Sequence, residues 1–222
     1  MAYYFQERLK YSPVRGLTGM GGGSVLSGAK SSGSTFCNDS TAGYCSGQEY
    51  SFDGTQNGEQ VFNSGTPGPA FNAMPRFTLQ WDLYIDGTAS GNSWHMQATP
   101  GWNEGDGLLI GVYNNWKIAV AGPQLGGYGF ISDTNLPSGD WRRIKYQFGV
   151  NSNGASGGQA CYYSSNEGST WSTQGSDNNK NQTTVTWNTG IWAGAGRQTP
   201  NSNWQEPFAG DVRNLEIWDT IV

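Results

Sequence analysis

The chain contains few charged residues, and this scarcity limits the partners that it can bind. Asp, Glu, Lys and Arg together make up 13% of its 222 residues, with 12 basic residues against 17 acidic ones. Binding to nucleic acid through its phosphates needs concentrated positive charge, whereas the formal net charge here is −5. We therefore predict that nucleic acid is not a partner.

Long apolar runs and a secretory leader are also missing. No apolar stretch approaches the roughly 18 residues of a membrane-spanning helix, so we predict no membrane partner. The first ten residues, MAYYFQERLK, lack the basic segment and apolar segment of a signal peptide. The low charge and the many neutral polar and aromatic residues are nevertheless typical of extracellular surfaces. A virion or extracellular location reached without a signal peptide would reconcile the two observations.

Metal-binding residues are equally scarce. His95 is the only histidine and there is no CxxC motif, so we predict no metal site. Calcium is possible near Asp86, Asp106 or Asp211, but no ligand spacing supports it, and no cofactor is predicted.

The three cysteines indicate little about function. Cys37 and Cys45 flank a glycine-containing turn and form either a loop-closing disulfide or two free thiols. Cys161 lies in an apolar segment, where we expect a small buried side chain.

The sequence is rich instead in glycine and in aromatic residues, with 34 Gly and 14% Phe, Trp and Tyr. The aromatic content excludes disorder as the main state, and the glycine and asparagine favour short strands joined by tight turns. The pattern predicts an all-β fold, a two-sheet antiparallel jelly-roll sandwich with an extended N-terminal arm. We expect strands at Gln48–Phe52, Gln60–Asn63, Arg76–Ile85, Ser93–Ala98, Leu108–Tyr113, Trp116–Ala121, Tyr128–Ser132, Trp141–Val150, Gln159–Ser165, Thr183–Trp187, Ile191–Ala193 and Asp211–Trp218.

Two of these segments alternate clearly between apolar and polar residues. In the first, Phe77, Leu79, Trp81, Leu83 and Ile85 share one face. The opposite face carries Thr78, Gln80, Asp82, Tyr84 and Asp86. In the second, Ile144, Tyr146, Phe148 and Val150 lie opposite Arg143, Lys145 and Gln147. Each strand therefore has one buried side and one polar side, and a polar outer face that bears aromatic rings suits saccharide binding.

The first 35 residues differ from the rest of the chain. A short apolar opening is followed by glycine- and serine-rich stretches, which usually form flexible connections. We divide the chain into an arm, 1–35, and a β-sandwich, 36–222. The arm is either flexible or docks on a neighbouring subunit, and we favour docking through its apolar residues Tyr3, Tyr4, Phe5, Leu9 and Tyr11.

The order of segments from about residue 48 to 222 resembles the concanavalin A-like superfamily. The resemblance rests on the early strand Arg76–Asp86, the turn and strand Leu136–Tyr146, the strand Gln159–Ser165 and the closing strand Phe208–Trp218. It implies a jelly-roll fold, in a superfamily that includes laminin-G-like modules, legume-type lectins, glucanases and polysaccharide lyases. Within it, the Asn/Gly loop after residue 150 looks most like lyase-type members.

A shorter segment, Ser164–Trp171, resembles the Asp-box with Asn166 in the aspartate position. Asn166 is expected to hydrogen-bond within its turn, Gly168 to adopt a positive φ, and Trp171 to pack over the turn. In the families that carry it, this box is structural, and a single copy does not indicate a sialidase propeller.

The candidates for catalysis are few. The glucanase pattern Glu-x-Asp-x-x-Glu is absent, and Asp82 and Asp86 are about 13 Å apart along one strand, too far for a glycosidase pair. A polysaccharide lyase acting on a uronate-containing polymer needs a base and a cation. Its candidates are His95, Tyr84, Arg143 and Lys145, each of which is also compatible with an ordinary strand position.

We interpret the chain as a non-enzymatic virion or extracellular structural protein, such as a phage decoration, fibre or tail component; the lyase is the alternative. Expected partners are other virion subunits or copies of itself, and a cell-surface polysaccharide. Tryptophans near loops and strand ends can stack on sugars or fill the core. The glycan-binding candidates are Trp94, Trp102, Trp116, Trp192 and Trp204.

Overall fold

The computed structural model describes most of the predicted β-sandwich. The residues described are 49–55, 59–62, 72–86, 92–98, 107–113, 116–122, 127–133, 135–150, 158–177, 184–186, 191–195, 205–218 and 220–222. The predicted arm with its five apolar residues, as well as Cys37 and Cys45, lies outside these ranges. Within them every regular element is a strand, and no helix there is long and apolar enough to cross a membrane.

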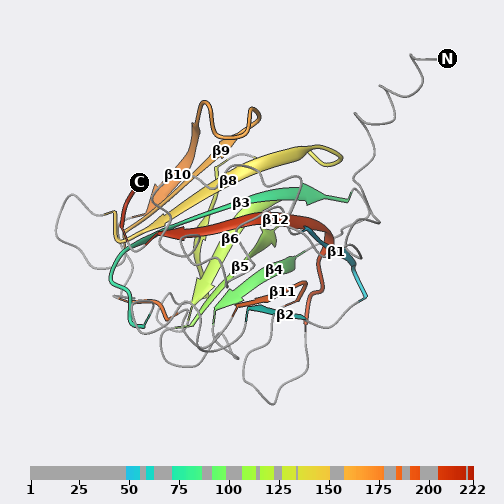
Figure 1. The fold of residues 1–222 in the computed structure, drawn as a ribbon, viewed down its shortest axis with the longest axis horizontal. Helices are drawn as coiled ribbons and strands as arrows, with labels where there is room; N and C mark the ends of the chain where they lie inside the picture. The colour runs from blue at the N-terminus through green and yellow to red at the C-terminus, as the bar shows by residue number, and fades with distance from the viewer. Residues whose placement is uncertain are drawn as a thin grey trace, which may run out of the picture.

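Two six-stranded antiparallel sheets pack face to face (Figure 1), which confirms the predicted all-β jelly-roll sandwich. The order in sheet A is β1 (Glu49–Asp53), β12 (Ala209–Trp218), β3 (Phe77–Ile85), β8 (Trp141–Phe148), β9 (Gln159–Ser164) and β10 (Ser172–Asp177). The order in sheet B is β2 (Glu59–Phe62), β11 (Ile191–Ala193), β4 (Ser93–Ala98), β5 (Leu108–Tyr113), β6 (Lys117–Gly122) and β7 (Gly127–Ile131).

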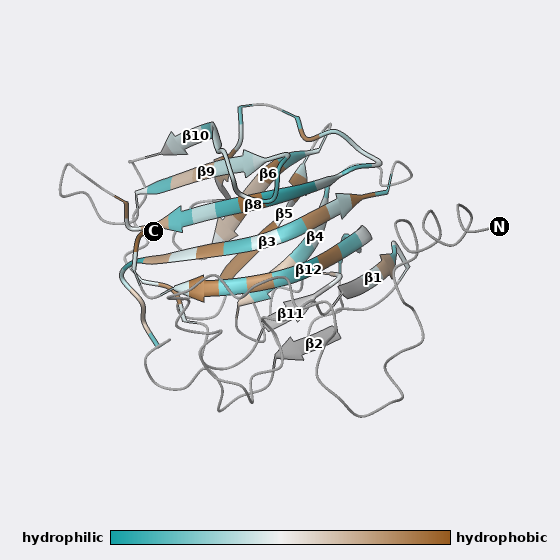
Figure 2. Ribbon diagram, turned by 45° about the horizontal axis from the view of Figure 1, so that its top comes forward, coloured by the Kyte–Doolittle hydropathy of each residue, from teal (hydrophilic) through white to brown (hydrophobic). Residues whose placement is uncertain are grey.

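The core lies between the sheets and is built by the alternation seen in the sequence. In β3, the five apolar residues from Phe77 to Ile85 are almost fully buried, and Ile144, Tyr146 and Phe148 of β8 meet the same core. Sheet B contributes alternate residues of β5 and β6, such as Ile110 and Val120. Val212, Leu215 and Ile217 of β12 join this core. The alternate side chains of β3, β8 and β12 face outward, and the mixed colouring of these strands in Figure 2 reflects this pattern.

Two segments differ from the strand prediction. Within the expected strand Thr183–Trp187, the described residues 184–186 form only an isolated bridge between Val185 and Met74. Conversely, β10 was not predicted, because its sequence STQGSD carries no apolar alternation. It forms instead by pairing with β9, with a register shift between Thr173 and Gly175.

Candidate functional site

The outer face of sheet A carries a connected set of polar and aromatic side chains. Strand pairing places its side chains in rows that cross the sheet. One row runs Asp211, Tyr84, Trp141; the next runs Arg213, Asp82, Arg143, Ser164; a third runs Glu216, Gln80, Lys145, Tyr162. Charged, amide and aromatic groups from four strands therefore meet on one rigid surface.

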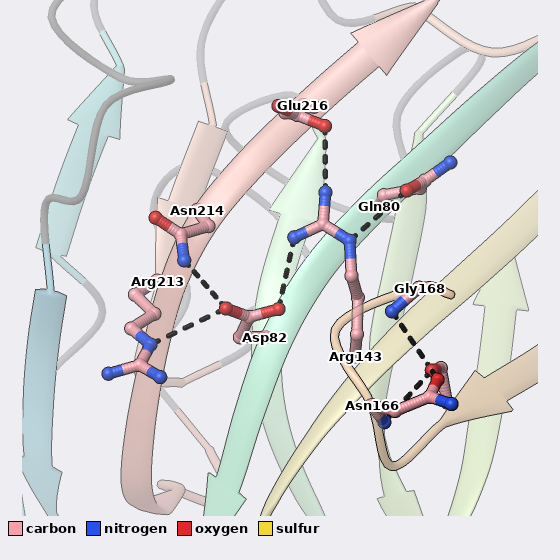
Figure 3. A network of polar contacts seen from close by, with 9 residues as sticks. Gln80, Asp82, Arg143, Asn166, Gly168, Arg213, Asn214 and Glu216 are labelled. Carbon is pink, nitrogen blue, oxygen red and sulfur yellow. Dashed lines mark hydrogen bonds and ion pairs between the residues drawn. The ribbon is translucent and has the colours of Figure 1, made fainter. Parts of the chain in front are cut away.

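An ionic network occupies the middle of this face (Figure 3). Arg143 donates to Asp82 at 3.0 Å, to Glu216 at 2.8 Å and to the side-chain oxygen of Gln80 at 3.2 Å. Asp82 also accepts from Asn214 at 2.6 Å and from Arg213 at 3.4 Å. The Arg143 side chain is 13% exposed and that of Glu216 only 3%, so these pairs are shielded from water.

Two aromatic rings lie beside this network. Tyr84 and Trp141 face each other across β3 and β8, with ring centroids 5.6 Å apart. The Arg213 guanidinium lies 3.7 Å from the centroid of Trp141, a cation–π contact that anchors the indole. Both rings remain partly exposed, so the network holds a pair of accessible aromatic side chains in place.

A second aromatic pair surrounds Lys145. Its ammonium lies 4.9 Å from the ring centroid of Tyr162 in β9 and 4.6 Å from that of Trp171. Partial burial lowers the pKa of Lys145, because the charged form loses hydration.

Trp171 is positioned by the turn that follows β9. The Ser164 hydroxyl accepts hydrogen bonds from the backbone N–H of Asn166 and of Gly168 (Figure 3). The Asn166 side-chain oxygen accepts from the backbone N–H of Thr170 at 2.9 Å, and Gly168 has φ +89°. A Cβ built on Gly168 would lie 3.2 Å from the Trp171 ring and 3.4 Å from the Arg143 side chain. The turn therefore packs directly against the network, with the conformation expected at Asn166 and Gly168.

The structure separates the four lyase candidates. Tyr84, Arg143 and Lys145 share the outer face of sheet A. His95 instead lies between the two sheets, 0% exposed, with its ring 5.7 Å from Trp81 and 5.3 Å from Phe208. Burial lowers the pKa of His95 to about 3, and neither ring nitrogen has a hydrogen-bond partner among the described residues.

The tryptophans chosen from the sequence do not form one surface. Trp94 is 7% exposed and packs in a small apolar cluster with Leu109, Ala119 and Ala121 on the outer side of sheet B. Trp116 lies in the turn before β6 and packs against the main core. Trp192 belongs to β11, of which only the backbone is described, and Trp102 and Trp204 lie outside the described residues. Glycan binding by these five residues stays a prediction.

No group of three or more His, Cys, Asp or Glu side chains in the described ranges could hold a metal ion. Cys161 is fully buried in β9, as expected, and burial raises the pKa of its thiol to about 12.

Sequence reasoning missed Trp141, Tyr162 and Trp171 as surface aromatics. For Trp141 a signal was available: two-residue periodicity in β8 places it on the same side as Arg143 and Lys145. The proximity of Tyr162 and Trp171 depends on pairing between strands that the sequence does not specify.

Comparison with known proteins supports the fold alone. No protein-family model matches the sequence, and no curated protein matches it. Among solved structures, a heptameric SAP-like pentraxin from Limulus polyphemus is 15% identical, with TM-score 0.54, covering 78% of this chain and 76% of that one. The CBM40 of the Ruminococcus gnavus IT-sialidase, bound to alpha2,3 sialyllactose, is 10% identical, with TM-score 0.56 and coverage of 79% and 90%. NanB, in a structure with Optactamide, is 9% identical with TM-score 0.57, and the match covers 78% of this chain but 26% of NanB. The chain thus shares the two-sheet jelly-roll β-sandwich fold of these structures.

Proposed function

We propose that this protein is a non-catalytic carbohydrate-binding component of a virion or of another extracellular assembly, and that sugar binds on the outer face of sheet A. The observation that carries the proposal is the arrangement of partly exposed aromatic rings on a polar sheet. Tyr84 and Trp141 are held beside an ionic network, and Tyr162 and Trp171 flank Lys145. Rings with one apolar face and polar neighbours suit the mixed C–H and hydroxyl surface of a saccharide.

The similarity to a sialyllactose-bound CBM40 adds support of a general kind, since it shows that a sandwich of this shape serves as a sugar-binding module in that protein. The ionic network supports binding rather than turnover. Both carboxylates at its centre, Asp82 and Glu216, are paired with Arg143, and Asp82 is also paired with Arg213. Removing one member of such a shielded pair leaves a charge without its partner, so these groups serve to hold the neighbouring side chains in position.

The test is native affinity electrophoresis of the full chain through gels that contain different polysaccharides, followed by staining for intact polymer. Wild-type protein should be retarded in at least one gel. Trp141→Ala and Tyr84→Ala should each weaken binding by about tenfold, because they remove contact area from the centre of the face. The control is Tyr113→Ala, which changes a ring packed on the outer side of sheet B and should leave retardation unchanged.

Two results would contradict the proposal. If Trp141→Ala and Tyr84→Ala were both retarded as strongly as the wild type, the sugar would bind elsewhere, for example at the tryptophans near the loops. Cleared zones in the stained gel would indicate cleavage and favour the lyase alternative, in which Tyr84, Arg143 and Lys145 would be tested next.

The virion part of the proposal rests on the composition and on the apolar opening of the chain. Deleting residues 1–35 should abolish self-association or attachment to partner subunits, measured by multi-angle light scattering. Unchanged assembly of the truncated protein would remove docking of the arm from the proposal.

A further inference from the structure

Lys145 occupies an unusual position on the outer face of sheet A. It lies in the middle of β8, paired across the sheet with Gln80 on one side and Tyr162 on the other. Its ammonium contacts the faces of Tyr162 and Trp171 and is only partly exposed. A lysine on a sheet surface normally extends into water, so this one is held against the face by the two rings.

The charge of Lys145 has no anionic partner among the described residues. The carboxylates nearest the centre of the face already form ion pairs with other groups. Asp82 and Glu216 pair with Arg143, and Asp82 also pairs with Arg213. Lys145 makes neither an ion pair nor a hydrogen bond there, and its three N–H donors are met only by aromatic rings. Partial burial lowers the pKa of Lys145, so an approaching anion would recover part of the hydration lost by the ammonium.

Gln80 of β3 is directly paired with Lys145 of β8 and carries a second donor on the same face of the sheet. The guanidinium of Arg143 offers only N–H groups, so the side-chain oxygen of Gln80 must face Arg143, as the 3.2 Å contact shows. The amide nitrogen of Gln80 therefore points away from Arg143 (Figure 3), and it has no hydrogen-bond partner among the described residues. An ammonium and an amide N–H₂ on directly paired residues form a donor pair that an oxyanion can accept from.

We propose that Lys145, Gln80, Tyr162 and Trp171 form a subsite for the anionic group, carboxylate or sulfate, of an acidic saccharide. This inference rests on the proposed function and adds the chemical class of its ligand. The rings keep water from one side of the ammonium, which strengthens its pairing with an anion, and they offer flat surfaces to the sugar that carries it. The net charge of −5 provides no general attraction for polyanions, so recognition depends on this local arrangement.

The experiment compares matched charged and neutral polymers by affinity electrophoresis and isothermal titration calorimetry of the full chain. Polygalacturonate is compared with its fully methyl-esterified form, and dextran sulfate with dextran. Wild-type protein should bind one of the charged polymers at least tenfold more tightly than its neutral counterpart. Lys145→Met should abolish this preference, whereas Lys145→Arg should retain most of it. The matched control is Lys117→Met, which removes a partly exposed lysine from β6 in sheet B and should leave the preference intact.

The outcomes separate this inference from the proposed function. Equal binding of charged and neutral polymers, sensitive to Trp141→Ala, would overturn the anionic subsite and leave sugar binding on the face in place. A charge preference that survives Lys145→Met would likewise overturn it. Failure to bind any polymer would overturn both. If only one charged polymer shows the Lys145-dependent preference, the subsite stands and that polymer identifies the anion as carboxylate or sulfate. Circular dichroism of each variant establishes that it is folded.

Discussion

The buried imidazole of His95 should make the protein progressively less stable in mild acid. His95 lies between Trp81 and Phe208, fully buried, and neither neighbouring ring carries a charge that could stabilise an imidazolium. Burial lowers the pKa of His95 from 6.5 to about 3. Between these values the unfolded chain binds a proton that the folded chain excludes, so stability falls as the pH falls from about 6.5 towards 3.

The magnitude follows from the two pKa values. At pH 7.5 the unfolded imidazole is almost entirely neutral, so the contribution is close to zero. At pH 5.0 the unfolded imidazole is almost entirely protonated and the folded one almost entirely neutral. Proton binding therefore favours the unfolded state by a factor of about 30, which corresponds to about 2 kcal/mol of lost stability. Acidic residues also begin to titrate in this range, but they are common to the wild type and to any variant at position 95.

The assay is urea unfolding of the wild type and of His95→Leu at both pH values. Because His95 is the only histidine, the leucine variant removes imidazole titration completely, and the wild type should lose about 2 kcal/mol more than the variant. His95→Gln, which is polar but does not titrate, should behave like the leucine variant. Equal pH dependence in all three proteins, within about 0.5 kcal/mol, would refute the reasoning. The Hε1 signal of this one histidine in proton NMR provides a test without mutation, since its chemical shift should not change between pH 7.5 and 5.0 while the protein is folded.

Three further predictions concern the described structure. Arg143→Met should lower the free energy of unfolding by about 2 to 4 kcal/mol in a urea titration, because two shielded carboxylates, Asp82 and Glu216, each lose one charged partner. Asp140→Asn, at an exposed ion pair, should cost about 0.5 kcal/mol or less, and equal effects of the two substitutions would contradict the network's role. Gly111→Ala should lower the free energy of unfolding by at least about 2 kcal/mol, because the new Cβ would lie 2.2 Å from the carbonyl oxygen of Ser93 and 2.5 Å from the Trp94 ring. An unchanged melting temperature would refute this packing. Cys161 should resist iodoacetamide at pH 8 in the native protein and react after denaturation, as followed by peptide mass spectrometry; rapid native labelling would show that the thiol is accessible.

The parts of the fold predictable from sequence are those in which alternation is unbroken. Along β3, and from Ile144 onward in β8, every second residue is apolar, so the buried and exposed faces of sheet A follow directly from the sequence. β10 has no such pattern and forms only through its partner strand. The arrangement of strands within each sheet depends on contacts between distant segments, which periodicity within one strand does not determine.

His95 could not be placed from sequence because β4 contains an irregularity. Pairing between β4 and β5 shifts register between Trp94 and Met96, so the simple inward and outward alternation fails at residue 95. His95 and Met96 consequently both face the core, while Trp94 lies on the outer side of sheet B. A shift of one residue thus decides between a surface histidine, as the lyase interpretation required, and a buried one.

A similar irregularity in β12 assembles the network and thereby leaves Lys145 without an anionic partner among the residues that the structure describes. With strict alternation, the residues on the same face as Arg213 would be Leu215 and Ile217, and the polar face would carry two large apolar side chains. The register shift between Arg213 and Glu216 returns both to the core, and Asn214 accommodates it with φ +52°, a conformation that asparagine tolerates well.

The sequence contains a signal for this bulge, because two residues lie between the apolar positions 212 and 215 but only one lies between 215 and 217, and asparagine is in the longer gap. Burial of Leu215 and Ile217 therefore forces Glu216 onto the outer face, where it pairs with Arg143 instead of remaining free to reach Lys145. The hydrophobic requirement of the core in one strand thus sets the electrostatics of the face that we propose binds sugar. Deleting Asn214 removes the bulge, and it should therefore disturb the burial of Leu215 and Ile217 together with the pairing of Glu216 and Arg143.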